Sequence, residues 1–239
     1  MTHHPLAENR PLPLHAEKRP LLIVGNSEIA AMAFEYFEHD SPWTPVAFVV
    51  DDAFITADTF NGLPLVSFEQ AATCYPPGEV TGFVAVGDGQ LNRLRMAMFD
   101  RMIGLGYELA SYVSSAAFVW RDVRIGRNCF ILEHNVLQPC VTIGDNVTLW
   151  SGNHIGHRSM IEDHVFMTSH VVVSGFCTIG ARAFLGVNAT LANGVIVAAD
   201  NFIAMAACIG ASTEADGIYK GNPAERHKLS AKRFCKVRE

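Results

Sequence analysis

A six-residue repeat constrains this chain more than any other feature. Over residues 119–209 every sixth residue is apolar, and no insertion breaks the phase. These positions are Val119, Ile125, Ile131, Leu137, Ile143, Leu149, Ile155, Ile161, Met167, Val173, Ile179, Leu185, Leu191, Val197, Ile203 and Ile209. An α-helix does not hold a six-residue phase, and an ordinary strand alternates in twos. The repeat therefore predicts a parallel β-helix, in which each hexad supplies a short strand and a turn.

The other positions of the hexad agree with this interpretation. Two residues before each apolar position the side chain is small or medium, as at Ala117, Cys129 and Asn135. We expect about five coils of three hexads, stacked at a strand spacing of about 4.8 Å. The apolar positions should form ladders inside, and the small residues should let the chain turn its corners. A sandwich of short strands is the alternative, but it would not keep phase over so long a stretch.

Composition narrows the possible functions. The net charge of −6 argues against a non-specific nucleic-acid binder and against binding to an anionic membrane surface. The longest apolar stretches are too short to span a membrane, and no cleavable signal is apparent. The six cysteines form no CxxC pair, which fits a reduced, cytoplasmic protein best.

The chain divides into four parts. Residues 1–19 are rich in proline and histidine without periodicity, and we interpret them as a flexible leader. Residues 20–113 predict a Rossmann-like α/β domain, because short apolar strands alternate with helical segments. The first loop of such a domain can face a nucleotide. Residues 114–216 predict the β-helix. Residues 217–239 predict a turn followed by a short basic helix, which could cap the open end of the β-helix or meet an anion.

Two loops of the α/β domain are candidates for ligand contacts. Gly25, Asn26 and Ser27 connect the first apolar strand to a helix, and such a loop can face a phosphate. Asp51 and Asp52 end the next strand, where acidic residues often bind ribose hydroxyls. An exposed acidic turn is an equally good interpretation of this pair.

Several motifs extend beyond the repeats. Val86-Gly87-Asp88 precedes Asn92 and Arg93, and Ser114-Ser115-Ala116 precedes the first coil. Ile155-Gly156-His157 is followed eighteen residues later by Ser174-Gly175, and Gly221-Asn222-Pro223-Ala224 forms the exit. With the order of α/β domain, left-handed β-helix and exit, the chain resembles the hexapeptide-repeat acyltransferases of the sialic-acid O-acetyltransferase and bacterial amino-sugar N-acetyltransferase type.

The resemblance implies an acetyl-CoA-dependent homotrimer with active sites between neighbouring β-helices. It implies that His157 is the general base, a role that suits an imidazole because it titrates near neutral pH. A backbone N–H near Gly175 would then meet the thioester oxygen. The family usually places an acidic residue directly after the base, whereas this chain has Arg158. Glu162 and Asp163, or an adjacent subunit, are therefore the candidates to orient the imidazole.

The resemblance also implies the remaining site residues, with a sugar or nucleotide sugar as acceptor and no bound metal. Arg226 and Lys228 would pair with the phosphates of coenzyme A. The expected coenzyme A path comprises Gly175, Val187, Ala204, Met205 and Lys220. The expected acceptor contacts are Gly25, Asn26, Ser27, Asp51, Asp52 and Asn92.

Two alternatives stay open. The first is a zinc enzyme like the trimeric γ-type carbonic anhydrases, which also have left-handed β-helices and bind zinc with three histidines. In this chain His134 and His170 are 36 residues apart and should lie on one edge of the β-helix, with His164 near them. The second alternative is a trimeric scaffold that binds a sugar nucleotide or a partner without turnover, because Met205 and Arg158 replace the usual residues. His154 is the reserve candidate for the base.

Overall fold

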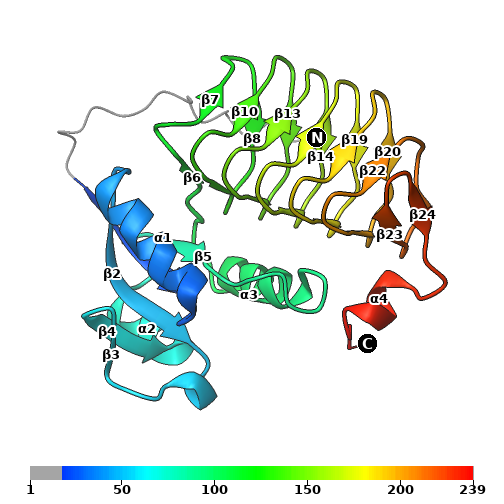
Figure 1. Ribbon diagram of the computed structural model, residues 1–239. Helices are drawn as coiled ribbons and strands as arrows, with labels where there is room; N and C mark the ends of the chain where they lie inside the picture. The colour runs from blue at the N-terminus through cyan, green and yellow to red at the C-terminus, as the bar shows by residue number, and fades with distance from the viewer. Residues whose placement is uncertain (1–17, 239) are drawn as a thin grey trace.

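The computed structural model describes residues 18–238, and the expected leader, apart from its last two residues, lies outside them. Figure 1 shows an α/β domain at one end of a parallel β-helix, with a short C-terminal helix at the other end. The predicted order of the three parts is therefore confirmed. No helix in residues 18–238 is both long enough and apolar enough to cross a membrane.

The α/β domain is built on a five-stranded sheet in the order β3-β4-β2-β1-β5. β1, β2, β4 and β5 are parallel, and β3 pairs with β4 antiparallel. The carboxyl ends of β1 and β5 therefore lie together, next to the loop that starts at Gly25. The elements are β1 (Arg19–Val24), α1 (Glu28–His39), β2 (Trp43–Val50), the 3₁₀ helix η1 (Asp52–Phe54), β3 (Thr59–Phe60), β4 (Leu63–Ser67), α2 (Phe68–Cys74), β5 (Thr81–Val84) and α3 (Arg93–Gly104).

Apart from the longer β23 and β24, the three faces of the β-helix are made of two-residue strands, which pair in parallel with the strand eighteen residues away. Face 1 is β7 (Phe118–Val119), β10 (Val136–Leu137), β13 (His154–Ile155), β16 (Val172–Val173), β19 (Thr190–Leu191) and β22 (Cys208–Ile209). Face 2 is β8 (Arg124–Ile125), β11 (Thr142–Ile143), β14 (Met160–Ile161), β17 (Thr178–Ile179) and β20 (Ile196–Val197). Face 3 is β6 (Tyr112–Val113), β9 (Phe130–Ile131), β12 (Thr148–Leu149), β15 (Phe166–Met167), β18 (Phe184–Leu185), β21 (Phe202–Ile203), β23 (Ile218–Gly221) and β24 (Ala224–Arg226). Because β6 belongs to face 3, the β-helix starts two residues before the expected boundary at 114.

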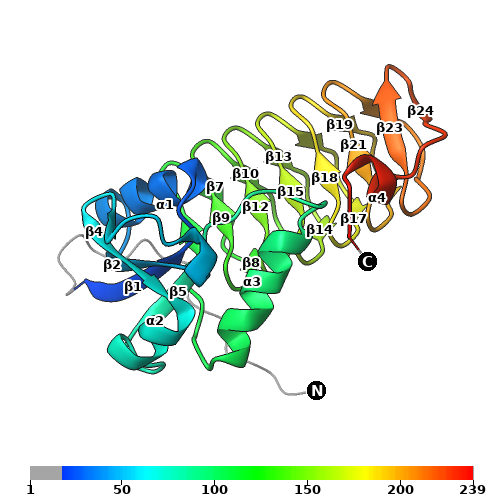
Figure 2. The ribbon, with the colours of Figure 1, turned by 90° about the horizontal axis from the view of Figure 1, so that it is seen from below.

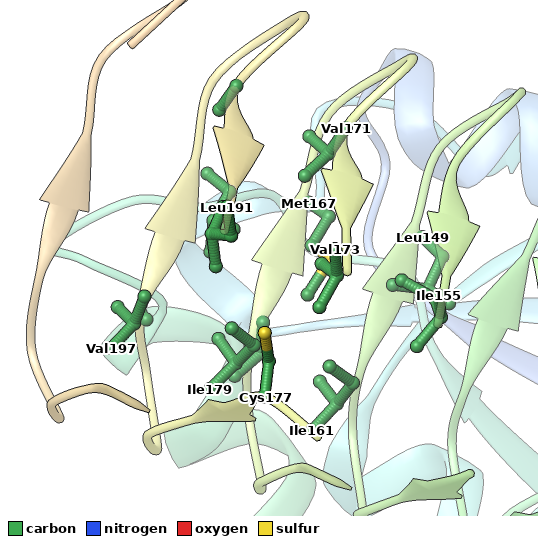
Figure 3. Close-up of a cluster of buried hydrophobic side chains, with 14 of the residues drawn as sticks. Leu149, Ile155, Ile161, Met167, Val171, Val173, Cys177, Ile179, Leu191 and Val197 are labelled. Atoms are coloured by element: carbon green, nitrogen blue, oxygen red, sulfur yellow. The ribbon is translucent and has the colours of Figure 1, made fainter. Parts of the chain in front are cut away.

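The core of the β-helix consists of the apolar ladders together with the small positions. Ile155, Val173 and Leu191 stack on face 1 and are fully buried (Figure 3). Small side chains such as Cys177 fill the corners of the same core. Where asparagine takes the small position, it bonds to the backbone instead: Asn153 accepts the N–H of Val171 at 2.7 Å. The ladders predicted from the six-residue phase are therefore present.

From Asn128 to Ala206 each corner turns through a residue with a left-handed backbone. The φ angle is positive at six-residue intervals, for example 54° at Asn128, 60° at His134 and 58° at Arg158. Asparagine and glycine tolerate this conformation best, but here it also falls on histidine and arginine. Histidine at these positions is therefore placed by the turn and does not point into the core.

Helix α3 attaches the α/β domain along face 3 of the β-helix (Figure 2). Arg95 of α3 is 1% exposed; its guanidinium donates to the Thr148 hydroxyl and to the carbonyls of His164 (3.0 Å) and Val165 (3.2 Å). Burial lowers the pKa of Arg95 to about 10. Within residues 18–238 its Nε has no partner. The contact therefore buries a positive charge against backbone dipoles without a hydrogen-bonded carboxylate.

A second set of contacts joins α1 to the first coils. The carboxylate of Asp40 accepts the Tyr112 hydroxyl at 2.7 Å and the N–H of Ser115 at 2.9 Å. Burial opposes ionisation, but these hydrogen bonds hold the pKa of Asp40 below its ordinary value. Tyr36 donates to Glu133 at 2.9 Å in the next coil. The two parts of the chain are thus joined by polar contacts as well as by apolar packing.

The end of the chain differs from the expected basic helix over residues 224–234. Residues Ala224–Arg226 form β24, which pairs antiparallel with β23, and only α4 (Ala231–Phe234) is helical. The turn at Asn222-Pro223 reverses the chain, so the segment extends face 3 instead of starting a helix. Phe234 of α4 then packs edge-on against Phe202, with ring centroids 5.0 Å apart.

Replacing Arg95 tests the contact between α3 and face 3. Arg95→Ala should lower the free energy of unfolding by about 2–4 kcal/mol, because it empties a buried site and breaks three hydrogen bonds. Arg95→Met should cost less, because it fills most of the volume and removes the buried charge. Urea unfolding followed by circular dichroism measures both, with Arg124→Ala on exposed face 2 as the control. Unchanged stability of Arg95→Ala would contradict the role of this contact.

Candidate active site

His157 lies at the corner between faces 1 and 2, in the turn that joins β13 to β14. Its side chain is exposed. Its backbone N–H donates to Oε1 of Gln138 at 2.9 Å, and its ring Nδ1 lies 3.3 Å from the same oxygen. The ring also packs edge-on against Phe176, with centroids 4.9 Å apart. An accessible imidazole is therefore held on two sides by neighbouring coils.

Gly175 lies directly beneath this imidazole. A Cβ atom on Gly175 would sit 2.6 Å from Cε1 and 2.9 Å from Nε2 of His157, so only glycine leaves room for the ring. One coil earlier, a Cβ on Gly156 would sit 2.5 Å from the backbone nitrogen of Gly175. No acceptor within residues 18–238 takes the N–H of Gly175. A free backbone donor thus lies beside a potential base.

The two expected orienting carboxylates do not contact His157 in this chain. They lie at the corner between faces 2 and 3, where Asp163 accepts the N–H of Asp145 at 2.8 Å. Glu162 accepts the N–H of Ala181 at 2.9 Å. Both therefore bond to turns of adjacent coils, and the prediction that either orients His157 within one chain is wrong. The reason is that residues five or six positions after His157 belong to the next corner of the same coil.

The residues expected along coenzyme A are divided between two corners. Gly175 lies with His157, whereas Val187, Ala204 and Met205 lie at the corner between faces 3 and 1. Val187 is 40% exposed and Met205 is 74% exposed. One β-helix therefore presents the base at one edge of face 1 and this apolar strip at the other edge.

Arg226 and Lys228, which were expected at the phosphates, lie together with Lys220, which was expected along the coenzyme A path. Lys220, Arg226 and Lys228 line an open groove of about 450 Å³ on the β23–β24 hairpin. Gly221, Pro223, Glu225 and His227 complete its lining. Arg226 also lies 3.4 Å from a carboxylate oxygen of Glu214. The groove combines positive charge with hairpin backbone, which suits an anionic group.

The loop over residues 25–27 lies at the carboxyl edge of the parallel sheet. Gly25 has φ = 124°, and a Cβ there would meet the carbonyl oxygen of Ala85 at 2.8 Å. The side chain of Asn26 donates to the carbonyl of Phe54 at 3.2 Å. Ser27 precedes α1 and its exposed hydroxyl makes no capping bond. Gly25 therefore has a steric role, and Ser27 is the residue of this loop whose side chain is open to a ligand.

The other three expected acceptor contacts have different environments. Asp51 forms an ion pair with Arg101, and Asp52 begins the exposed turn η1. Asn92 is fully buried, and its amide donates to the carbonyls of Arg182 (2.9 Å) and Ala183 (3.3 Å). The prediction for Asn92 is wrong, because its side chain fastens the start of α3 to the β-helix.

The histidines considered for zinc do not gather in one chain. His134 and His170 lie two coils apart at the corner between faces 3 and 1, whereas His164 lies at the corner between faces 2 and 3. Its Nδ1 is 2.9 Å from the amide of Asn146, and its ring packs edge-on against Phe99. Burial lowers the pKa of His164. Residues 18–238 contain no group of three or more His, Cys, Asp or Glu side chains arranged to hold a metal ion.

Two neighbours of His157 were missed in the sequence. Gln138 precedes it by nineteen residues and Phe176 follows it by nineteen, so each lies one coil away. The six-residue repeat could have predicted both neighbours, because residues eighteen apart are paired in register on adjacent coils. Glu162 and Ala181 show the same nineteen-residue relation at another corner.

Comparison with known proteins agrees with this architecture. Residues 122–157 match the family described as "Bacterial transferase hexapeptide (six repeats)". One similar structure is a variant of perosamine N-acetyltransferase from Caulobacter crescentus, solved with CoA and GDP-perosamine. Its sequence is 24% identical and its TM-score is 0.79, and the match covers 87% of this chain and 96% of that one. The acetyltransferase domain of PglB from Neisseria gonorrhoeae FA1090, solved with acetyl coenzyme A, is 21% identical with a TM-score of 0.78, over 88% and 100%.

A sequence relative carries the name of a different enzyme. Mitochondrial gamma carbonic anhydrase 1 of Arabidopsis thaliana is 31% identical over 152 residues, which are 56% of this chain and 54% of that protein. This chain thus spans about half the length of the curated relative it matches. The comparisons together show hexapeptide repeats of the bacterial transferase type on the two-domain fold of sugar N-acetyltransferases. The predicted resemblance is confirmed at that level.

Gly175→Ala tests the geometry around the base directly. The added methyl group should displace the imidazole of His157, whose proton chemical shifts depend on its edge-on contact with Phe176. NMR of histidine-labelled protein should show the His157 signals moving by more than those of any other histidine. Gly210→Ala is the matched control, since a Cβ at this corner glycine meets nothing within 4 Å. Unchanged His157 signals in Gly175→Ala would contradict the placement of the ring.

Proposed function

We propose that this chain transfers an acetyl group from acetyl-CoA to the amine or hydroxyl of a sugar or nucleotide-linked sugar. The observation that carries the proposal is the exposed imidazole of His157 above Gly175. The imidazole supplies a proton acceptor and the N–H of Gly175 supplies a free backbone donor. Both lie at one corner of a fold that sugar N-acetyltransferases share. Acyl transfer needs both groups, because a proton leaves the nucleophile while negative charge forms on the thioester oxygen.

The chemistry follows from these two groups. The acceptor nitrogen or oxygen attacks the thioester carbonyl carbon, and His157 removes its proton. The N–H of Gly175 donates to the oxygen that becomes negative in the tetrahedral intermediate. When the carbon–sulfur bond breaks, the imidazolium returns the proton to the departing thiolate. Acetylated sugar and free coenzyme A are the products, and His157 is neutral again.

We propose that the active unit is a homotrimer. The base and the strip of Val187, Ala204 and Met205 lie at opposite edges of face 1, so one chain cannot enclose a donor between them. A neighbouring protomer placed against face 1 would bring its strip to the base. Exposed apolar side chains on and beside this face support such an interface, including Phe118 at 52%, Phe176 at 53% and Met205 at 74% exposure.

The donor and acceptor then approach from different parts of the chain. In the proposal, the thioester lies near His157 and the phosphates of coenzyme A reach the groove of Lys220, Arg226 and Lys228. The acceptor is bound by the α/β domain through the loop over residues 25–27 and Asp52, with Asp51 available if Arg101 releases it. Nucleotide-sugar binding is supported by the GDP-perosamine complex of the structural neighbour. The six free cysteines favour a reducing compartment such as the cytoplasm.

His157→Ala tests the proposal. Release of free coenzyme A thiol from acetyl-CoA, assayed with a panel of amino-sugar nucleotides, should fall roughly 10²–10⁴-fold, the usual contribution of a general base. Light scattering should show the same trimer for wild type and variant. His39→Ala, an exposed histidine of α1, is the control and should keep full turnover. Wild-type turnover in His157→Ala would overturn the assignment of the base.

The same measurements separate the two alternatives. A non-catalytic scaffold would be stabilised by a nucleotide sugar in a thermal-shift assay but would release no thiol in its presence. A zinc enzyme would contain stoichiometric metal after purification without a histidine tag and would lose its activity with a chelator.

A further inference from the structure

We propose that Gln138 is a positioning residue that fixes the tautomer of His157, keeping the proton on Nδ1 and leaving Nε2 to accept a proton. The catalytic meaning of this inference rests on the proposed function, whereas the tautomer itself does not. Gln138 lies in the coil before His157, in the turn that joins β10 to β11. It takes the place of the carboxylate that was expected to orient the base.

The backbone of His157 fixes which way the amide of Gln138 faces. The N–H of His157 can only donate, so the amide of Gln138 must turn its oxygen towards it, at 2.9 Å. This contact settles which end of the amide is oxygen, a choice that the amide shape alone does not reveal. The same oxygen lies 3.3 Å from Nδ1 of the ring. A carbonyl oxygen can only accept, so a hydrogen bond between these two atoms requires the hydrogen on Nδ1. In a neutral imidazole Nε2 is then the proton acceptor.

The surrounding contacts keep the ring in this orientation. Phe176 packs against it edge-on, and Gly175 lies beneath it without a side chain. The ring therefore cannot rotate far without losing the contact with Gln138 or meeting a neighbouring coil. This arrangement differs from a histidine on an open surface, where both tautomers interchange freely.

An amide orients the ring without charge. Gln138, Phe176 and the backbone at Gly175 all lie beside the imidazole, and none of them ionises near neutral pH. The nearest charged neighbour along the chain is Arg158. A carboxylate at position 138 would instead favour the imidazolium and so withdraw the base in weakly acidic solution. Gln138 thus separates two effects that a carboxylate combines, orientation and charge stabilisation.

Two substitutions test the inference in the full-length trimer. Gln138→Leu removes the acceptor, and Gln138→Glu keeps an acceptor while adding charge. For Gln138→Leu we expect kcat to fall by roughly tenfold, the rate equivalent of one hydrogen bond, with little change in KM for acetyl-CoA. For Gln138→Glu we expect the acidic limb of the pH–kcat profile to move to higher pH.

A direct readout does not depend on turnover. Two-bond ¹⁵N–¹H correlation spectra of histidine-labelled protein identify the protonated ring nitrogen. His157 should show the proton on Nδ1 in the wild type and in Gln138→Glu, and a mixture of tautomers in Gln138→Leu. Asp122→Leu is the matched control: Asp122 accepts the N–H of Cys140 at 2.9 Å one coil earlier on the same corner, without facing an imidazole.

The outcomes separate this inference from the proposed function. The role of Gln138 would be overturned if the wild type carries its proton on Nε2. It would also be overturned if Gln138→Leu keeps the wild-type tautomer, kcat and pH profile. Either result would count even if His157→Ala is inactive. Conversely, full turnover in His157→Ala would overturn the proposed base while the tautomer result still stands. If Gln138→Leu does not fold, an unchanged pH profile in Gln138→Glu would overturn the inference.

Discussion

The structure depends on the parallel pairing of each two-residue strand with the strand eighteen residues away. Ile155 pairs in register with Leu137 on one side and Val173 on the other, so one apolar position per hexad builds a continuous ladder. Each coil buries its apolar side chains only against the coils next to it, which explains why the six-residue phase is unbroken. The left-handed residues at the corners from Asn128 to Ala206 turn the chain at the same point of each hexad, which preserves the six-residue repeat of the apolar positions.

The same stacking builds the candidate site. The contacts of His157 come from the coil before it, through Gln138, and from the coil after it, through Gly175 and Phe176. A rigid stack of turns can thus hold a base by contacts about one coil away along the chain in either direction. The carboxylates of Glu162 and Asp163 also bond to turns of adjacent coils, but at another corner.

Attachment of the α/β domain uses polar groups, one of which, Asn92, was expected to contact the acceptor. Asn92 and Arg95 both bond to backbone carbonyls of the β-helix, and Asn128, at the corner between β8 and β9, bonds to Val84 of β5. Buried polar groups of this kind need partners in a specific geometry, so they define one orientation of the domain on face 3. This orientation sets where the carboxyl edge of its sheet lies relative to the coils.

The β-helix, its inward ladders and the α/β domain before it could all be predicted from the sequence, whereas His157 as the candidate base is what the resemblance to known acyltransferases implies. Those features follow from local periodicity and from motifs that a single stretch of chain contains. Only the tertiary structure decided that Gln138 faces the imidazole, that Asn92 is buried, and that residues 224–226 form a strand carrying the basic groove. Periodicity predicts whether a side chain points inward or outward. The residue that it contacts depends on which turn of the next coil, or of the α/β domain, lies beside it, and the periodicity does not contain that information.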